Sequence, residues 1–219
     1  AAWSDIARKI AHEVKNPLTP IKLSAERIEK KSKDNLINID EVKQLTQTIS
    51  KQVDDIDKLI DEFSSFARMP EAEIKLDNLT QTLKDSFNLF SDSHSKINMK
   101  LNVDEKDIYY NFDSFQITQA FNNIIKNAIE AVNKIPNPSI IVNLSEENNS
   151  IKLFVIDNGI GIDENKITKL FEPYYTTKEK GTGLGLSIVK KIVEDHGGII
   201  KIEKNKNMAG TTTIVYFEN

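Results

Sequence analysis

Hydrophobic residues in the first 70 positions recur in steps of three and four, the spacing of one face of an amphipathic helix. A polar stretch at residues 30–40 divides them into two series, so the pattern predicts two long helices joined as a hairpin. Each helix would be about 45 Å long at about 1.5 Å per residue. The first series is Trp3, Ile6, Ala7, Ile10, Val14, Leu18, Ile21, Ala25 and Ile28, and the second is Val42, Leu45, Ile49, Val53, Ile56, Leu59, Phe63 and Phe66. A lone hairpin of this length cannot cover both stripes, so we expect a homodimer through residues 1–70 that completes a four-helix bundle.

Two prolines, Pro17 and Pro20, fall inside the first helical pattern. Each removes a backbone donor and crowds the preceding turn, so we expect the helix to bend or loosen just after His12. The alternative is that one helix ends at Asn16 and a new one starts. The apolar stripe continues through Leu18, which favours a single helix.

The pattern changes after the second helix, which we expect Asp40 to cap and Met69-Pro70 to end. Residues 71–76 are predicted to be a short linker, and residues 77–219 mix helix and strand signals. The expected helices are 77–89, 113–132 with Asp113 as its cap, and 183–196, and the expected strand pairs are 98–103 with 108–112, 140–144 with 151–156, and 199–203 with 211–217. The predicted fold is therefore α+β: a helical hairpin at 1–70, followed by an α/β sandwich with helices on one face of a mixed sheet.

Composition narrows the class of protein. Of the 219 residues, 39% are hydrophobic and 28% charged, which is typical of a globular protein. The net charge of −4, with no dominant basic patch, argues against a nucleic-acid partner. No apolar run reaches transmembrane length, so we expect no direct membrane contact. The absence of cysteine excludes disulfides and cysteine metal sites and fits a reducing compartment, so we expect a cytoplasmic location.

The chain begins at Ala1, without methionine and already within a helical pattern. We therefore expect a piece of a longer protein, whose upstream part would carry any sensor or membrane-anchoring segment.

Two glycine-rich turns lie in residues 157–187. The turn Asp157-Asn158-Gly159-Ile160-Gly161 follows a predicted strand, and Gly181-Thr182-Gly183-Leu184-Gly185 opens a predicted helix. Glycines let the backbone approach a bulky ligand and leave N–H groups to point at it. The N-terminus of the following helix adds partial positive charge. The sequence therefore predicts a nucleotide phosphate site with the Asp157 carboxylate at its back wall.

A polar face is predicted on the helix after Asp113, because Asn123, Asn127 and Glu130 are spaced four and three residues apart. An amide offers a neutral oxygen to a hard cation, and Mg²⁺ favours few protein ligands together with phosphate oxygens and water. The alternative is a simple solvated helix face.

His12 and Glu13 form a second candidate for chemistry. A neutral imidazole is a good nucleophile, and an adjacent carboxylate can accept its proton. Neighbouring helical positions do not face each other, so the contact would need the local bend. Asn16 lies one turn on and would be placed to orient a water. The alternative is an ordinary surface histidine.

These segments resemble, in the same order, five sequence boxes of the sensor histidine kinases of two-component systems, and the resemblance covers nearly all of the chain. The boxes are His12-Glu13-Val14-Lys15-Asn16-Pro17-Leu18 (phosphoacceptor), Asn123-Ile124-Ile125-Lys126-Asn127-Ala128 (N box), Asp157-Asn158-Gly159-Ile160-Gly161 (first glycine box), Phe171-Glu172-Pro173 (F box) and Gly181-Thr182-Gly183-Leu184-Gly185-Leu186 (second glycine box). One glycine turn alone is weak evidence, whereas five boxes in order are specific. The segments 17–20 and 174–178 and a short lid are most similar to the nitrogen-regulation type.

The resemblance implies roles for individual residues and a Bergerat-type fold for the ATP-binding domain. His12 would take the γ-phosphoryl group of ATP, Glu13 would orient or deprotonate it, and Asn16 matches a phosphatase position. Asn127 would hold Mg²⁺, with Asn123 on the phosphate side. The remaining nucleotide residues would be Asp157, facing the adenine amino group, and Gly159, Gly161, Phe171, Lys178, Gly181, Thr182, Gly183, Leu184 and Gly185. The implied partner is a response regulator, whose receiver domain takes the phosphoryl group in trans on an aspartate.

Related ATP-binding folds occur in gyrases, mismatch-repair ATPases and heat-shock chaperones, where a glutamate at the position matching Asn123 activates water. An amide cannot act as that general base, and Glu130 lies seven residues later. The sequence therefore favours transfer to a protein nucleophile over simple ATP hydrolysis. Two alternatives stay open: a nucleotide-responsive dimeric scaffold without phosphotransfer, and an isolated ATPase.

Overall fold

The structure is a computed structural model that describes residues 2–34, 38–67, 70–178, 181–206 and 208–218. The chain divides into two compact units. One comprises Ala1–Met69 together with Thr176–Leu184, and the other comprises Pro70–Tyr175 together with Gly185–Asn219.

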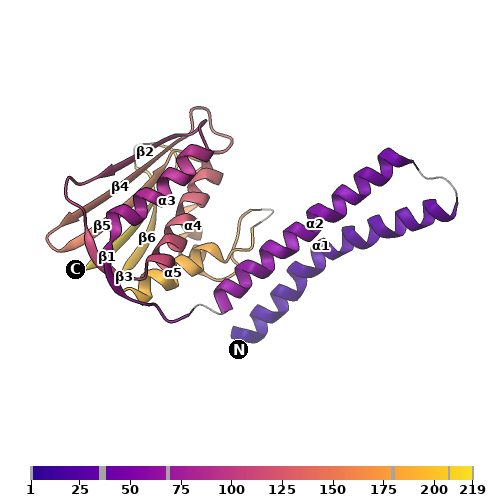
Figure 1. Cartoon of the computed structure of the whole chain (residues 1–219), viewed down its shortest axis with the longest axis horizontal. Helices are drawn as coiled ribbons and strands as arrows, with labels where there is room; N and C mark the ends of the chain where they lie inside the picture. The colour runs from indigo at the N-terminus through magenta and orange to yellow at the C-terminus, as the bar shows by residue number, and fades with distance from the viewer. Residues whose placement is uncertain (1, 35–37, 68–69, 179–180, 207, 219) are drawn as a thin grey trace. The chain divides into compact units, whose positions relative to one another are not determined.

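The first unit contains two long helices, α1 (Ala2–Lys33) and α2 (Ile39–Ala67), which lie side by side as an antiparallel hairpin (Figure 1). Helix α1 continues through Pro17 and Pro20, so the alternative of a break at Asn16 is wrong. Pro17 and Pro20 have no N–H, so the carbonyl groups four residues before them lose their helical donors. No helix among the described residues is long and apolar enough to cross a membrane.

The cap of α2 differs from the prediction. Asn38, not Asp40, precedes the helix, and its side-chain oxygen accepts from the backbone N–H groups of Asp40 (2.9 Å) and Glu41 (3.4 Å). Asp40 instead stands in the first turn, where its negative charge suits the positive end of the helix dipole. The helix is described to Ala67, and Met69 of the predicted stop lies outside the described residues.

Over the side chains that the structure describes, the hairpin has no closed apolar core of its own. Among the described side chains of α1 and α2, the only one that is buried is the polar Ser24. The described apolar side chains of the two predicted stripes are half-buried or exposed, with Leu18 at 48% and Val53 at 43% exposure. The uncovered stripes that the sequence predicts are therefore present in the single chain.

The second unit is a two-layer α/β sandwich, as predicted. Helices α3 (Leu79–Ser93), α4 (Ser114–Val132) and α5 (Gly185–Asp195) cover one face of a five-stranded mixed sheet (Figure 1). The strand order is β2-β4-β5-β7-β6, with β2 and β4 parallel and the other neighbours antiparallel. The strands are β2 (Asn98–Val103), β4 (Ser139–Glu147), β5 (Ser150–Asp157), β6 (Ile199–Lys204) and β7 (Thr211–Glu218).

One predicted strand pair is wrong. Strand β3 (Tyr109–Phe112) does not pair with β2 but with β1 (Lys75–Asn78), in a separate two-stranded sheet. Alternation of side chains sets which face of a strand is buried but does not name its neighbour. Strand β1 also takes up Lys75 and Leu76 of the predicted linker, and Asn78 caps α3 through a 2.9 Å bond from the Gln81 N–H. The other two predicted pairs are confirmed as β4–β5 and β6–β7.

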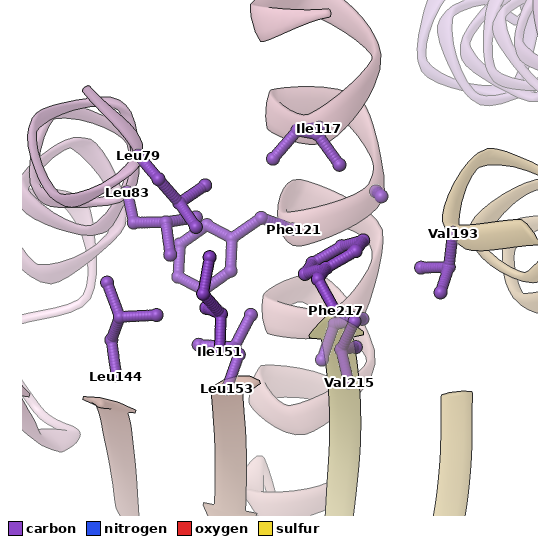
Figure 2. A pocket seen from close by; sticks show the side chains of 12 residues that line it. Leu79, Leu83, Ile117, Phe121, Leu144, Ile151, Leu153, Val193, Val215 and Phe217 are labelled. Carbon is purple, nitrogen blue, oxygen red and sulfur yellow. The ribbon is translucent and has the colours of Figure 1, made fainter. Parts of the chain in front are cut away.

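The core lies between the helices and the sheet, and it encloses a cavity of about 20 Å³ (Figure 2). Side chains from all three helices and from the strands line it, among them Leu83, Phe121, Val193 and Phe217. All the lining side chains are hydrocarbon, so a water inside would find no polar partner. None of the predicted nucleotide residues lines this cavity, which is therefore a packing gap of the core.

Candidate functional site

The Asp157 carboxylate lies at the end of β5 and is only 5% exposed. Its Oδ1 accepts hydrogen bonds from the backbone N–H groups of Gly159 (2.8 Å) and Thr211 (3.3 Å). Its backbone oxygen accepts from the Asn205 side-chain amide at 2.7 Å. Burial raises the pKa of Asp157, and the two backbone donors only partly oppose that rise. The carboxylate is thus a fixed, poorly solvated acceptor, suited to an uncharged donor such as an aromatic amino group.

Two glycines make the turn around Asp157 possible. A Cβ on Gly159 would lie 2.6 Å from the backbone oxygen of Ala131 at the end of α4. Gly210 has a φ of +108°, and a Cβ there would lie 2.0 Å from the backbone oxygen of Asp157. The first glycine turn is therefore packed between α4 and the start of β7, with no room for a side chain at either position.

The N box and the second glycine box meet at the start of α5. Asn123 and Asn127 are half-buried on α4, one turn apart. A Cβ on Gly185, the first residue of α5, would lie 3.7 Å from the Asn123 Oδ1. The backbone N–H groups of a helix N-terminus can receive phosphate groups, and amide oxygens beside it can hold the cation that accompanies them.

The donor set on α4 fits Mg²⁺ held together with phosphate. Within the described ranges, no group of three or more histidine, cysteine, aspartate or glutamate side chains could hold a metal ion. Mg²⁺ commonly takes one or two protein oxygens and completes its shell with phosphate and water. Asn127 can supply such an oxygen, so the residues present fit the cation without forming a cage of their own.

The segment after the first glycine turn begins with the 3₁₀ helix η1 (Glu164–Phe171), which Asp163 caps. Phe171 is half-buried, and the Lys190 ammonium group of α5 lies 5.9 Å from the centre of its ring. Phe171 of the F box therefore contacts α5, the helix whose first residue lies beside Asn123.

The residues from Thr176 to Leu184 group with the first unit. Locally, the Thr176 hydroxyl accepts from the Lys178 N–H at 3.1 Å, and the Thr182 hydroxyl accepts from the Leu184 N–H at 3.3 Å. Gly181 and Gly183 belong to the same stretch, and Gly183 has a φ of +68°. Short turns stabilised by threonine hydroxyls thus lie just before the second glycine box and within it.

His12, Glu13 and Asn16 all lie on α1 in the first unit. His12 and Asn16 are exposed and one turn apart, so they share a face, whereas Glu13 is half-buried. The imidazole is therefore accessible to a reagent from outside the hairpin. The predicted nucleotide residues Asp157 and Asn127 belong to the other unit.

Sequence reasoning missed Asn205 and Thr211, which donate hydrogen bonds to Asp157, and Gly210, whose lack of a side chain lets the backbone pass close to it. The available signal was a Gly-Thr pair opening the last strand. Only the β5–β7 pairing, with Ile156 opposite Thr212, brings that pair to Asp157.

Comparisons with known proteins agree with this geometry. Residues 2–72 match the family model described as His Kinase A (phospho-acceptor) domain, and residues 112–219 match the one described as Histidine kinase-, DNA gyrase B-, and HSP90-like ATPase. The nitrogen regulation protein NtrY of Azorhizobium caulinodans is 41% identical over an alignment of 208 residues, which covers 92% of this chain. The chain spans 27% of that protein's length.

Solved structures show the same similarity. The catalytic domain of the histidine kinase ThkA is 33% identical with a TM-score of 0.61, over 67% of this chain and 95% of that one. ThkA in complex with the response regulator protein TrrA is 26% identical with a TM-score of 0.79, over 98% of this chain and 61% of that one. The chain therefore belongs to the sensor histidine kinases, a family of phosphotransferases, and is similar to their nitrogen-regulation type.

Proposed function

We propose that this chain is an ATP-dependent histidine autokinase that transfers the γ-phosphoryl group of ATP to His12. From there the group passes to an aspartate on the receiver domain of a response regulator. The observation that supports the proposal is an exposed imidazole on α1 in the same chain as a buried Asp157 carboxylate that accepts from two backbone N–H groups. Functionally, residues 1–70 form the phosphoacceptor part and residues 77–219 the catalytic part, with 71–76 between them.

ATP would donate its adenine amino group to Asp157, and Gly159, Gly161, Gly181, Gly183 and Gly185 would be the glycines of its binding turns. Thr182, Leu184 and Phe171 would flank it, and Lys178 would reach a phosphate. When bound, Mg²⁺ would be held by Asn127, with Asn123 on the phosphate side, and would neutralise phosphate charge.

In the transfer itself, one imidazole nitrogen of His12 attacks the γ-phosphorus, a nitrogen–phosphorus bond forms and the bond to the β-phosphate oxygen breaks. ADP leaves with the electron pair of that bond. Glu13 accepts the proton released from the imidazole. Such transfer depends mainly on positioning and on charge neutralisation.

The test is labelling with γ-³²P-ATP and Mg²⁺. We expect a phosphoprotein that is labile in acid and stable in base, and we expect His12→Ala to abolish it. His94→Ala is the matched control, because His94 lies at the end of α3 and is tied to the Phe90 backbone oxygen at 2.9 Å. Full labelling of His12→Ala would refute the assignment. Nucleotide binding without label would favour a scaffold, and hydrolysis that persists without His12 would favour an isolated ATPase.

A phosphatase role toward the phosphorylated regulator is a second candidate. Asn16 is exposed, one turn after His12 on the same face of α1, and its amide can orient a water against a phosphoryl group. We expect Asn16→Ala to slow loss of phosphate from the regulator while His12 still becomes labelled. Unchanged dephosphorylation would remove this role.

We also propose that the active form is a homodimer through residues 1–70. The support is the half-buried and exposed apolar stripe of α1 and α2, which a second hairpin would cover.

A further inference from the structure

The chain that leaves the helical hairpin is bound to the first turn of α4. Asp113, the cap residue of α4, accepts from the Gln116 N–H through Oδ1 at 3.0 Å. Its other oxygen, Oδ2, accepts from the backbone N–H of Glu73 at 2.9 Å. One carboxylate thus caps the helix and holds the incoming chain.

Gln116 makes a second attachment. Its side chain is only 1% exposed, and its amide nitrogen donates to the backbone oxygen of Pro70 at 3.0 Å. The Gln116 Oε1 is buried with no hydrogen-bond partner in the described part of the chain. Leaving a buried polar atom unpaired is costly, so an apolar side chain would pack more favourably here. What the glutamine adds is its bond to Pro70.

The backbone of Asp113 is also hydrogen-bonded, to His196 at the end of α5. The backbone N–H of Asp113 donates to the His196 Nε2 at 3.0 Å, and the His196 Nδ1 bonds to the Ile192 backbone oxygen at 2.7 Å. Burial acts to raise the pKa of Asp113, but the N–H groups of Gln116 and Glu73 outweigh it and lower the pKa overall. The carboxylate is therefore ionised at neutral pH and remains a strong acceptor.

We propose that Asp113 and Gln116 are positioning residues, which clasp Pro70 and Glu73 to the catalytic part and so fix the pivot about which it reaches His12. This inference rests on the proposed function, because it concerns how the catalytic part is positioned for phosphorylation of His12. The linker clasp consists of Pro70, Glu73, Asp113 and Gln116.

The clasp sets the length of the joint between the two parts. With it closed, only residues 68 and 69 separate Ala67, the end of α2, from clasped Pro70. With it open, the next anchor is Lys75 in β1, so the joint grows to residues 68–74. Effective concentration falls roughly as the −3/2 power of tether length, so two residues against seven gives about a sixfold drop. Opening the clasp should therefore slow phosphorylation of His12 without altering the ATP site.

Two variants open the clasp from different sides. Asp113→Ser keeps a side-chain oxygen to cap α4 but removes the second acceptor, and Gln116→Met removes the bond to Pro70 while keeping its own backbone N–H. The matched control is Glu73→Gln, which removes the exposed ion pair with Lys75 (3.0 Å) and leaves the Glu73 N–H in place. Thermal unfolding verifies that each variant is folded.

The measurements are the rate of His12 labelling at saturating ATP, the KM for ATP, and hydrogen exchange of the Glu73 amide. We expect both clasp variants to lower the labelling rate about threefold to tenfold, with KM within twofold of wild type and faster exchange at Glu73. Glu73→Gln should match wild type. An unchanged or raised rate, a parallel rise in KM, or an equal loss in Glu73→Gln would overturn the proposal.

Hydrogen exchange separates this inference from the proposed function. If wild type does not label His12, the proposed kinase activity fails, and the clasp is then judged by exchange alone. Equal exchange at Glu73 in wild type and in Asp113→Ser would overturn the clasp even in an active kinase.

Discussion

The helical hairpin and the ATP-binding part reach stability by different routes. Apolar side chains such as Phe121 (1% exposed) and Val142 (0%) close a continuous core in the ATP-binding part, within one chain. In the hairpin, no described apolar side chain is buried. The hairpin has the local pattern of a bundle but only half of its members, and we propose that a second copy supplies the rest.

The candidate chemical groups repeat this contrast. His12 is exposed on one helix and owes its position to that helix alone. Asp157 is buried, and one of its backbone donors, Thr211, is 54 residues away. In the proposed function this difference fits the two roles: a nucleophile such as His12 must be accessible, whereas a carboxylate that orients the adenine must be held rigidly. Disturbing each part separately should therefore give separable effects.

The largest effect is expected from Gly210→Ala. A Cβ there would lie 2.0 Å from the Asp157 backbone oxygen, and φ is +108°, so we expect a loss of about 3–5 kcal/mol in the free energy of unfolding of the ATP-binding part. Gly197→Ala is the control: its φ is +72° but nothing lies within 4 Å of the added Cβ, so it should lose only about 1 kcal/mol. Urea unfolding of both variants measures the difference, and equal losses would contradict this close approach.

The second largest effect is expected on the proposed dimer. Leu18 in the apolar stripe of α1 is 48% exposed in the single chain, and we expect Leu18→Asp to weaken dimerisation by about 3 kcal/mol, since two copies each lose about 1.5 kcal/mol of apolar burial. The control is Leu89→Asp on α3, where the leucine is 66% exposed and no partner is proposed. Sedimentation equilibrium measures both. A dimer equally sensitive to the two changes, or to neither, would place its interface elsewhere than this face of the hairpin.

Asp157→Asn should act on nucleotide affinity rather than on stability. The variant keeps one side-chain oxygen for the Gly159 N–H but turns the other acceptor into a donor, which opposes an incoming amino group. We expect ATP affinity to fall about 10- to 100-fold, the value of one charge-assisted hydrogen bond of about 1.5–3 kcal/mol. Titration calorimetry measures it, with the exposed Asp195→Asn as control. Unchanged affinity would mean that Asp157 does not face the base.

Local features of the fold were predictable because short stretches of sequence determine them. The two helices of the hairpin follow from the spacing of residues three and four apart, and the Asp113 cap needs only Gln116, three residues on. The predicted cap of α2 was wrong for a local reason too. Asn38 and Asp40 are both good cap residues, they lie two positions apart, and the sequence alone does not choose between them.

Long-range features were not predictable in the same way. The alternation of apolar and polar side chains in β2 predicts which side of the strand is buried but not which strand lies next to it. Its neighbour is β4, which comes after β3 and α4 in the chain. The Asp157 turn was found from its glycines, whereas Gly210 and Thr211 reach it only through the pairing of β5 with β7. The docking of Glu73 on Asp113, 40 residues away, left no local signal at all.

The smallest effect concerns pH and separates two aspartates of the ATP-binding part. Burial raises the pKa of Asp157 above its ordinary value of 3.8, so its ionised form is a cost to the folded state at neutral pH. That cost shrinks as pH falls through the raised pKa and is absent below 3.8. The pKa of Asp113 is lowered, so its contribution is complete above 3.8 and is lost only as pH falls further, through that lowered pKa.

Between pH 7 and about pH 4, therefore, Asp157 changes its contribution and Asp113 does not. The quantity to measure is the free energy of unfolding of wild type minus that of Asp157→Asn, because the other carboxylates cancel in the difference. We expect this difference to move in favour of wild type as pH is lowered through this window, and the same subtraction for Asp113→Asn to stay flat. If acidification instead lowers the free energy of unfolding of wild type relative to that of Asp157→Asn, the two backbone donors would have a larger effect on the pKa of Asp157 than burial has. The surroundings of Asp157 would then favour its charged form. Asp157 and His12 would differ only in how accessible their side chains are.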